Sequence, residues 1–259
     1  MAKALNNILS TKKVDLVIQV LDARAIEISS NKELIKNFNK PTINIAMKSD
    51  LSIAKRDENI IYVSKLDNNV KRIVITAMNN LMKEKIVHLK EKGLLKPHFH
   101  CMIIGLPNLG KSTLINLLLG RNKTEVSNKP GVTRHNSLIK INDTFSIYDT
   151  PGIMSKNVND IKEGYILSLI NCVPQKIVPM EDVLEFAFEY YKKYFFNDMH
   201  KIFAINKDTT FDNFVETVSI KNNFLTNNAE IDILRCHNYL YEKFVNSSLF
   251  KVNYEMINK

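Results

Sequence analysis

Apolar residues in the first 150 positions fall into short continuous runs, and the segments between these runs carry apolar residues at helical spacing. Continuous apolar runs are typical of strands that helices cover on both faces, because neither face then meets water. The runs that predict such strands are VDLVIQVLDA (14–23), TINIA (42–46), NIIYVS (59–64) and HCMII (100–104). Helices are expected at 32–38, 71–93 and 112–120. This alternation predicts an α/β fold with a mostly parallel sheet and helices on both faces.

The pattern changes toward the end of the chain. SLIKI (137–141) and TFSIYD (144–149) predict a hairpin that turns at Asn142-Asp143, and three helical segments follow beyond Pro179, at 181–196, 211–219 and 229–245. Between these parts, CVPQKIVP (172–179) carries two prolines, which are typical of a linker. We therefore predict an α/β domain at 1–175 and an all-helical domain at 176–259.

Charge is distributed unevenly between the two predicted domains. Residues 1–175 hold 26 Lys and Arg against 15 Asp and Glu, whereas residues 176–259 hold 10 against 12. A basic surplus in one domain favours a polyanionic partner such as RNA. The alternative is compositional drift, because Lys, Asn and Ile are frequent throughout the chain.

Several classes of protein are disfavoured by composition. No apolar run approaches the roughly 18 residues of a membrane-spanning helix, so no membrane partner is expected. The three cysteines, Cys101, Cys172 and Cys236, form no C-x-x-C pair, which argues against a zinc site or a disulfide framework. We predict a cytoplasmic protein.

The stretch GLPNLGKS, residues 105–112, fits the pattern G-x-x-x-x-G-K-[ST] at every position. It follows an expected strand and precedes an expected helix, which is the context a phosphate-binding P-loop requires. Glycines at 105 and 110 allow backbone N–H groups to surround phosphates. Lys111 would then bridge the β- and γ-phosphates, and Ser112 would ligate Mg²⁺. The predicted nucleotide contacts in this stretch are Asn108, Leu109, Gly110, Lys111, Ser112 and Thr113.

A second phosphate-related pattern, DTPG at 149–152, ends the last expected strand about forty residues later. Asp149 can hold the Mg²⁺ shell, and the Gly152 N–H can reach the γ-phosphate. Thr133 lies between the two patterns and could give Mg²⁺ a second hydroxyl when the γ-phosphate is present. Such a loop would be ordered by one phosphate and released by its loss. An ordinary loop threonine is the alternative for Thr133.

The stretch MKSD, residues 47–50, follows the expected strand TINIA and resembles a guanine-reading Asn-Lys-x-Asp loop in its last three positions. The Asp50 carboxylate can accept two hydrogen bonds from guanine, which adenine cannot offer. Lys48 would lie along the base, with Ser49 beside it. Ser64, at the end of the next strand, is placed for a backbone contact to the guanine oxygen. Met47 cannot make the polar contacts of Asn, so we expect weaker guanine binding with selectivity retained.

The order of these patterns is unusual, because the base-reading loop precedes the P-loop. The chain resembles the circularly permuted GTPases of ribosome assembly, and most closely the ribosome biogenesis GTPase A (YlqF/RbgA) family. The blocks that carry the resemblance are MAKA (1–4), VLDAR (20–24), SSN (29–31), KPGVT (129–133) and DTPGI (149–153). The resemblance implies a permuted P-loop GTPase domain, GTP and GDP as ligands, and a helical RNA-contacting domain. It also implies GTP hydrolysis coupled to late assembly of the large ribosomal subunit, with rRNA as partner and no DNA.

The same resemblance assigns catalytic groups. A P-loop Asn in this family holds a catalytic K⁺, and Asn108 occupies that place, although a turn-forming role is equally consistent with an Asn there. Ile153 cannot orient water, as a Gln does in many GTPases, and the family's catalytic His belongs just ahead of the MAKA block. Either residues precede Met1 or hydrolysis relies on another group. His135 is a candidate for that group, and a solvent-facing loop His is the alternative.

Two other functions compete with the assembly GTPase. One is a nucleotide-dependent switch whose partner is a protein, for which binding should depend little on salt. The other is a GTP-binding scaffold with impaired hydrolysis, which Met47 and Ile153 would favour. For the assembly GTPase we expect a monomer whose GTP turnover is slow in isolation and is stimulated by the large ribosomal subunit.

Overall fold

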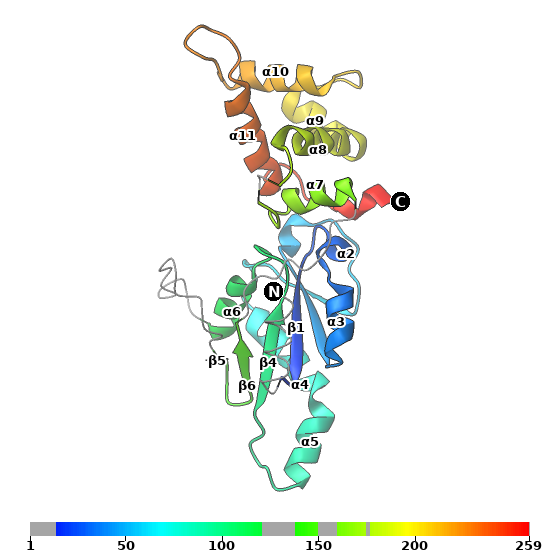
Figure 1. The fold of residues 1–259 in the computed structure, drawn as a ribbon, viewed down its shortest axis with the longest axis vertical. Helices are drawn as coiled ribbons and strands as arrows, with labels where there is room; N and C mark the ends of the chain where they lie inside the picture. Colours follow the sequence, from blue (N-terminus) through cyan, green and yellow to red (C-terminus); the bar gives the residue numbers. More distant parts are fainter. Residues whose placement is uncertain (1–13, 121–137, 150–159, 175–176, 259) are drawn as a thin grey trace. The chain divides into compact units, whose positions relative to one another are not determined.

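The computed structural model describes residues 14–120, 138–149, 160–174 and 177–258, and the chain divides into two compact units, Met1–Asn157 and Val158–Lys259. The first unit contains a six-stranded sheet in the order β3-β2-β1-β4-β6-β5 (Figure 1). All neighbouring strands are parallel except β5 and β6. The strands are β1 (Leu16–Asp22), β2 (Thr42–Met47), β3 (Ile60–Tyr62), β4 (Phe99–Ile104), β5 (Leu138–Lys140) and β6 (Phe145–Tyr148).

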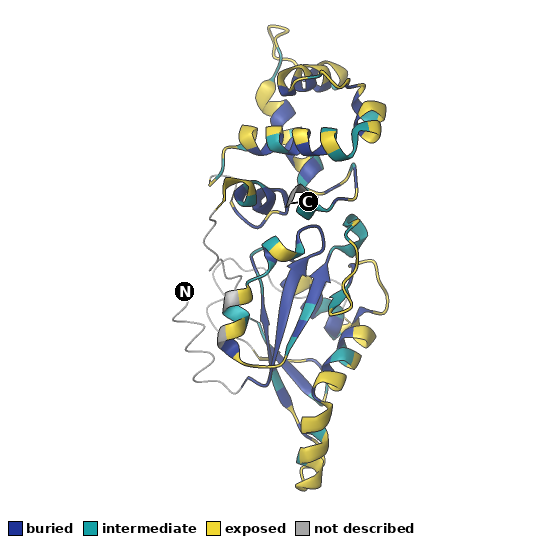
Figure 2. Ribbon diagram, turned by 90° about the vertical axis from the view of Figure 1, so that its right-hand side faces the viewer, coloured by how far each residue is buried: buried dark blue, intermediate teal, exposed yellow. Residues whose placement is uncertain are grey.

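Helices connect the parallel strands and cover the sheet. They are α2 (Ile26–Ser29), α3 (Lys32–Phe38), α4 (Val70–Leu81), α5 (Lys83–Glu91) and α6 (Lys111–Leu119). In Figures 1 and 2, α3 lies on one side of the sheet and α4 on the other, and α5 extends beyond its end. The predicted α/β architecture with a mostly parallel, doubly covered sheet is therefore confirmed.

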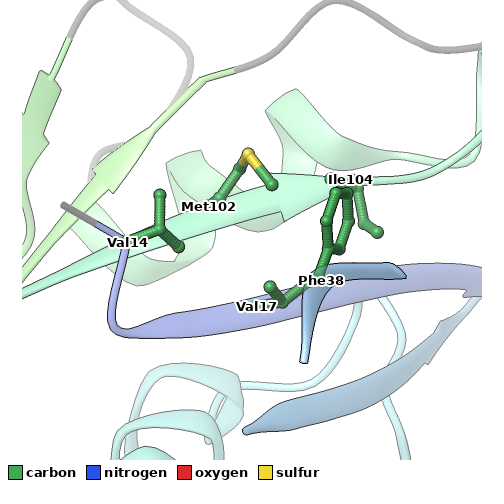
Figure 3. Packing of buried hydrophobic residues seen from close by; sticks show 5 residues of the cluster. All are labelled: Val14, Val17, Phe38, Met102 and Ile104. Carbon is green, nitrogen blue, oxygen red and sulfur yellow. The ribbon is translucent and has the colours of Figure 1, made fainter. Parts of the chain in front are cut away.

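The central strands β1, β2 and β4 are largely buried, as their continuous apolar sequences predict, whereas β3 at the edge is only partly buried. Every residue of β1 is buried. On the α3 side, Val17 of β1 packs with Phe38 of α3 and with Met102 and Ile104 of β4 (Figure 3). Burial of a side chain of this size contributes about 1.5–3 kcal/mol. The strands that lead to the predicted site are thus fixed by burial of their apolar side chains.

The second unit is helical. Its elements are α7 (Ile161–Leu169), α8 (Met180–Tyr194), α9 (Phe196–Phe203), α10 (Phe211–Lys221), α11 (Ile233–Val245) and the 3₁₀ helix η2 (Tyr254–Asn258). Aromatic rings hold it together: Phe188 stacks on Phe214 at 4.8 Å between ring centroids, and the Tyr191 hydroxyl lies 2.9 Å from that of Tyr254. Both Tyr190 and Tyr191 are buried, which assigns them to the core.

Three features of the elements differ from the sequence-based expectation. The units divide at 157/158, before α7, whereas the proline-rich stretch predicted 175/176; α7 packs against α8 and α11 and so belongs with the second unit. The expected helix at 71–93 is two helices, which meet at Met82 (φ −96°, ψ 4°). Likewise, the helix expected at 181–196 ends at Tyr194, and α9 follows it.

Candidate nucleotide-binding site

The P-loop leaves the carboxyl end of β4 and turns into α6, and two glycines make that path possible. Gly105 has φ +153°, and a Cβ there would lie 2.7 Å from the backbone oxygen of Val20 on the neighbouring strand. Gly110 has φ +100° and is the residue before α6. Side chains rarely adopt these conformations, and Gly adopts them without strain. The glycines therefore let the loop run close to β1 before it turns toward the helix.

Lys111 is the first residue of α6 and is buried, yet its charged end is turned back toward the loop. Its Nζ donates to the backbone oxygens of Gly105, at 3.1 Å, and Leu106, at 2.8 Å. Ser112 and Thr113 are exposed in the first turn of the helix. The predicted phosphate groups therefore lie together: a lysine ammonium inside the loop, and two hydroxyl residues at the positive end of a helix dipole.

Asn108 and Leu109 form the middle of the loop. Asn108 adopts a left-handed conformation with φ +58°, which Asn tolerates better than most residues. Leu109 is fully buried and fixes the loop to the core. The turn-forming role considered for Asn108 is thus present in the structure, and it does not compete with a role for the side chain toward a cation.

Asp149 follows β6, which pairs in parallel with β4, so both chains leave the sheet at the same edge. The carboxyl group is half-buried, and this burial raises its pKa, whereas the charge of Lys111 acts in the opposite direction. Lys111 and Asp149 therefore lie close enough to interact electrostatically.

The residues at this edge fit a magnesium ion shared with a nucleotide. Mg²⁺ prefers oxygen ligands and is usually held by one or two carboxylates together with substrate phosphates. Ser112 and Asp149 supply a hydroxyl and a carboxylate. Among the described residues, no group of three or more His, Cys, Asp and Glu could hold a metal by itself. The donor set therefore fits Mg²⁺ completed by phosphate oxygens, and not a cage made of protein alone.

The MKSD segment leaves the carboxyl end of β2 and is held by backbone hydrogen bonds. Lys48 has φ +60°, and Ser49–Leu51 form a 3₁₀ turn in which Asp50 is partly exposed. The Ser49 N–H donates to the Val63 oxygen at 3.2 Å, which joins this segment to the one after β3.

Ser64, in the segment after β3, is buried and takes part in a tight turn. Its N–H donates to the Asp67 carboxylate at 2.7 Å, and its hydroxyl accepts from the Leu66 N–H at 3.1 Å. The two segments predicted to read the base are therefore adjacent, and hydrogen bonds within each segment hold its conformation.

The strand order brings the base segment and the P-loop together although 63 positions separate Met47 from Gly110. Strand β1 lies between β2 and β4, and its residues pair with Met47 on one side and with Ile104 on the other. Met47 is buried, and its Cε lies 3.5 Å from the place a Cβ would take on Gly110. An apolar contact therefore joins the two segments at the position where the guanine-reading pattern has Asn.

Known families match this arrangement. The profile of the 50S ribosome-binding GTPase family matches residues 100–207. A probable ribosome biogenesis GTPase A from Mycoplasma pneumoniae is 36% identical over 246 residues, which cover 94% of this chain and 89% of the relative. The ribosome biogenesis GTPase A of Bacillus pumilus is 30% identical, with 73% of this chain and 72% of the relative covered. The chain belongs to the ribosome biogenesis GTPase A family.

A solved member of this family has the same fold. The crystal structure of GNP-bound YlqF from T. maritima superimposes with a TM-score of 0.67 at 21% sequence identity, covering 97% of each chain. The predicted family and the P-loop GTPase fold are therefore confirmed, and this chain is a GTPase that binds guanine nucleotides.

Two charged residues of this GTPase, Asp22 and Arg24, have no assigned role in the sequence-based prediction. Asp22, at the end of β1, is fully buried and accepts hydrogen bonds from Nε and Nη2 of Arg24, each at 2.9 Å. The Lys48 Nζ donates to the same carboxylate at 2.7 Å. Burial by itself raises the pKa of Asp22, but the charges of Arg24 and Lys48 outweigh it and lower that pKa to about 2.

This network ties the base segment to the neighbouring strand. The sequence feature that could have revealed this network is the charged pair Asp22 and Arg24, which directly follows an apolar run within the VLDAR block. No local feature shows that Asp22 also pairs with Lys48. Lys48, predicted to lie along the base, is therefore positioned by a buried carboxylate.

Three residues considered for catalysis, Thr133, His135 and Gly152, lie outside the described residues, as does Ile153. Their roles stay predictions. In the described parts of the chain, no helix is both long and apolar enough to cross a membrane.

Proposed function

We propose that this GTPase acts in assembly of the large ribosomal subunit and that GTP binding controls its contact with that subunit. Membership in the ribosome biogenesis GTPase A family supports a role in ribosome assembly. The observation that carries the proposal is the meeting of the P-loop and the base segment at one sheet edge, through Met47 and Gly110.

The residues at this edge have distinct roles in the proposed reaction. Asp50 selects guanine, because its carboxylate matches the two donors of that base. Lys48 lies along the base, held by Asp22. Lys111 neutralises charge on the β- and γ-phosphates, and its position against two loop oxygens keeps its ammonium group inside the loop.

Bound Mg²⁺ would neutralise charge on the same phosphates. In this proposal Ser112, Asp149 and Thr133 hold that ion, Asn108 holds a potassium ion, and Gly152 contacts the γ-phosphate. The two loops that contain Thr133 and Gly152 would then be ordered by GTP and released after its hydrolysis to GDP. This release would couple hydrolysis to departure from the ribosomal subunit, where rRNA is the proposed contact.

The test is GTP turnover in potassium buffer with large ribosomal subunits, with small subunits and with neither, using ATP as the control nucleotide. We expect large subunits alone to raise GTP turnover many-fold, and sodium to support less of this increase than potassium. Tight GTP binding without turnover under every condition would instead indicate a hydrolysis-impaired scaffold. Equal stimulation by both subunits would contradict the proposed specificity.

A further inference from the structure

A pocket of about 690 Å³ lies in the second unit and includes none of the residues of the nucleotide-binding site. We call it the lysine pocket, after Lys162 of α7, Lys192 and Lys193 of α8, and Lys207 of the α9–α10 connection. Aromatic side chains, among them Phe186 and Phe196, complete the lining, with one acidic residue, Glu189. The volume is in the range of about 300–1,000 Å³ that is usual for sites that enclose a small molecule.

The charge of this pocket is opposite to the charge of the unit that contains it. Residues 158–259 carry 11 Lys and Arg against 14 Asp and Glu, so the unit is acidic. Four of those 11 cations nevertheless line one pocket with a single carboxylate. Concentrating positive charge in a hollow raises the local potential and attracts anions, even where the net charge of the domain does not.

The four lysines differ in how the fold holds them. Lys192 is half-buried, and its Nζ donates to the Thr209 oxygen at 2.7 Å. Lys162, Lys193 and Lys207 are exposed. The pocket therefore combines one cation fixed by the backbone with three whose long side chains can follow a ligand's phosphates.

The aromatic side chains of the lining are Phe186, Tyr190, Tyr194 and Phe196, and the two tyrosine hydroxyls are already hydrogen-bonded. The Tyr190 hydroxyl donates to the Asn253 oxygen at 2.7 Å, and the Tyr194 hydroxyl donates to the Met256 oxygen at 2.9 Å. Both phenol hydroxyls thus already donate hydrogen bonds to the segment around η2. Phe186 and Phe196 are half-buried. Rings that offer a face without a free polar group stack on nucleic-acid bases regardless of base identity.

We infer that the lysine pocket binds an unstacked nucleotide of a single-stranded RNA segment, with its base on the aromatic lining and its flanking phosphates on the lysines. Proteins bind single-stranded nucleic acid by combining basic side chains, which contact phosphates, with aromatic side chains, on which bases stack. An acidic protein segment would use the lysines and leave the ring faces unused. RNA as the macromolecule rests on the proposed ribosomal function, and the pocket specifies where and in which form the RNA is bound.

The experiment uses the full chain saturated with GDP and a fluorescein-labelled, unstructured 12-nucleotide RNA, with binding followed by fluorescence anisotropy from about 50 to 200 mM KCl. The charge variant is Lys193→Glu with Lys207→Glu. Its matched control is Lys201→Glu with Lys251→Glu, two exposed lysines outside the pocket that change the net charge equally. Phe196→Leu tests stacking and keeps an apolar side chain of similar bulk.

The two kinds of variant should weaken binding in different ways. The pocket charge variant should bind RNA at least about tenfold more weakly, with a salt slope smaller by about one for each lost phosphate contact. Phe196→Leu should bind several-fold more weakly with the salt slope unchanged, because stacking releases no counterions. The Lys201/Lys251 control should remain within about twofold of the unaltered chain at about 150 mM salt, because neither lysine lines the pocket and salt at this concentration screens exposed charges.

Other outcomes separate this inference from the proposed function. If the chain binds RNA and neither pocket variant weakens it, the RNA site lies elsewhere and the pocket inference is wrong. If the chain binds no RNA but large subunits still stimulate turnover, the pocket inference fails and the function stands. If free AMP displaced the labelled RNA as effectively as unlabelled RNA does, the lysine pocket would be a site for free nucleotides, and the inference would be overturned. If pocket-dependent RNA binding is found without subunit stimulation, the pocket inference stands and the proposed function fails.

Discussion

Replacing Asp22 with Asn should strongly destabilise the first unit, because Asp22 is the shared acceptor for two cations. Its side chain has no exposed surface, and that of Arg24 is 1% exposed. The Asp22→Asn change removes the negative charge and replaces one acceptor oxygen with an amide NH₂ group. That group would face the N–H donors of Arg24 and Lys48. Breaking a buried pair by removing one partner costs about 3–5 kcal/mol. A domain of this kind has about 5–15 kcal/mol of stability in all, so the loss is large.

The pKa of Asp22 gives an independent measure of part of this cost. The pKa is about 2 in the folded protein against an ordinary value of 3.8. A pKa that is lower in the folded state stabilises the fold above the unfolded value, and this stabilisation is lost as pH falls through the folded value. The difference corresponds to about 2 kcal/mol. The rest of the expected effect comes from the amide donor that Asn places against Arg24 and Lys48.

The assay is urea unfolding followed by circular dichroism, because the chain has no tryptophan to report by fluorescence. The control is Asp143→Asn. Asp143 pairs with Lys140 at 2.8 Å in the same unit, but both side chains are largely exposed. We expect Asp22→Asn to lower the unfolding midpoint clearly, Asp143→Asn to leave it unchanged, and the gap between them to narrow as pH falls from about 4 to about 2. Equal effects of the two substitutions at neutral pH would refute the reasoning.

Three further substitutions test the nucleotide-binding site. Lys111→Ala should lower GTP affinity about 10- to 100-fold in a fluorescent-nucleotide titration, because a hydrogen bond to a charged group contributes about 1.5–3 kcal/mol. Gly105→Ala should reduce GTP binding and the unfolding midpoint together, since its Cβ would meet the Val20 oxygen at 2.7 Å. Met47→Ala should destabilise the unit by about 2–5 kcal/mol in urea, because it opens a cavity between the base segment and Gly110.

Each of these predictions has an outcome that would contradict it, and the first two have a matched control. Lys83→Ala changes an exposed lysine on α5 and should leave GTP affinity intact; if it matched Lys111→Ala, a general charge effect would explain both. Gly93→Ala is also at positive φ but meets no atom within 4 Å, so it should leave GTP binding unchanged. Normal GTP binding by Gly105→Ala would show that the loop can move away from β1. Stability unchanged by Met47→Ala would show that the contact with Gly110 contributes little.

Local features of the fold and site were predictable from the sequence because their causes are local. The P-loop depends on two glycines between a strand and a helix, and Gly105 and Gly110 adopt the required positive φ. The hairpin at Asn142-Asp143 formed as expected, with the side-chain Oδ1 of Asn142 accepting hydrogen bonds from the backbone N–H groups of Thr144 and Phe145. The continuous apolar runs predicted the strands β1, β2 and β4 as largely buried, whereas the run at 59–64 formed the partly buried β3.

Element boundaries and the division into units were less predictable. The helical pattern runs through Met82 without a proline or glycine, so nothing local marks the break between α4 and α5. Proline composition suggested the boundary near 175, but α7 is assigned by its packing against α8 and α11, which is a long-range property. The apolar residues of α7 are visible in the sequence, but the sequence does not show whether they pack into the core of the first unit or of the second.

The sequence by itself determined the α/β class, the P-loop with Lys111, and Asp50 as the base-reading candidate, because each follows from spacing within a few residues. Tertiary structure alone decided which distant segments meet. Pairing of β1 with both β2 and β4 brings Met47 against Gly110 and Asp22 against Lys48. Strand order and register are set by burial of the whole sheet, so no single segment contains the information that joins the base segment to the phosphate loop.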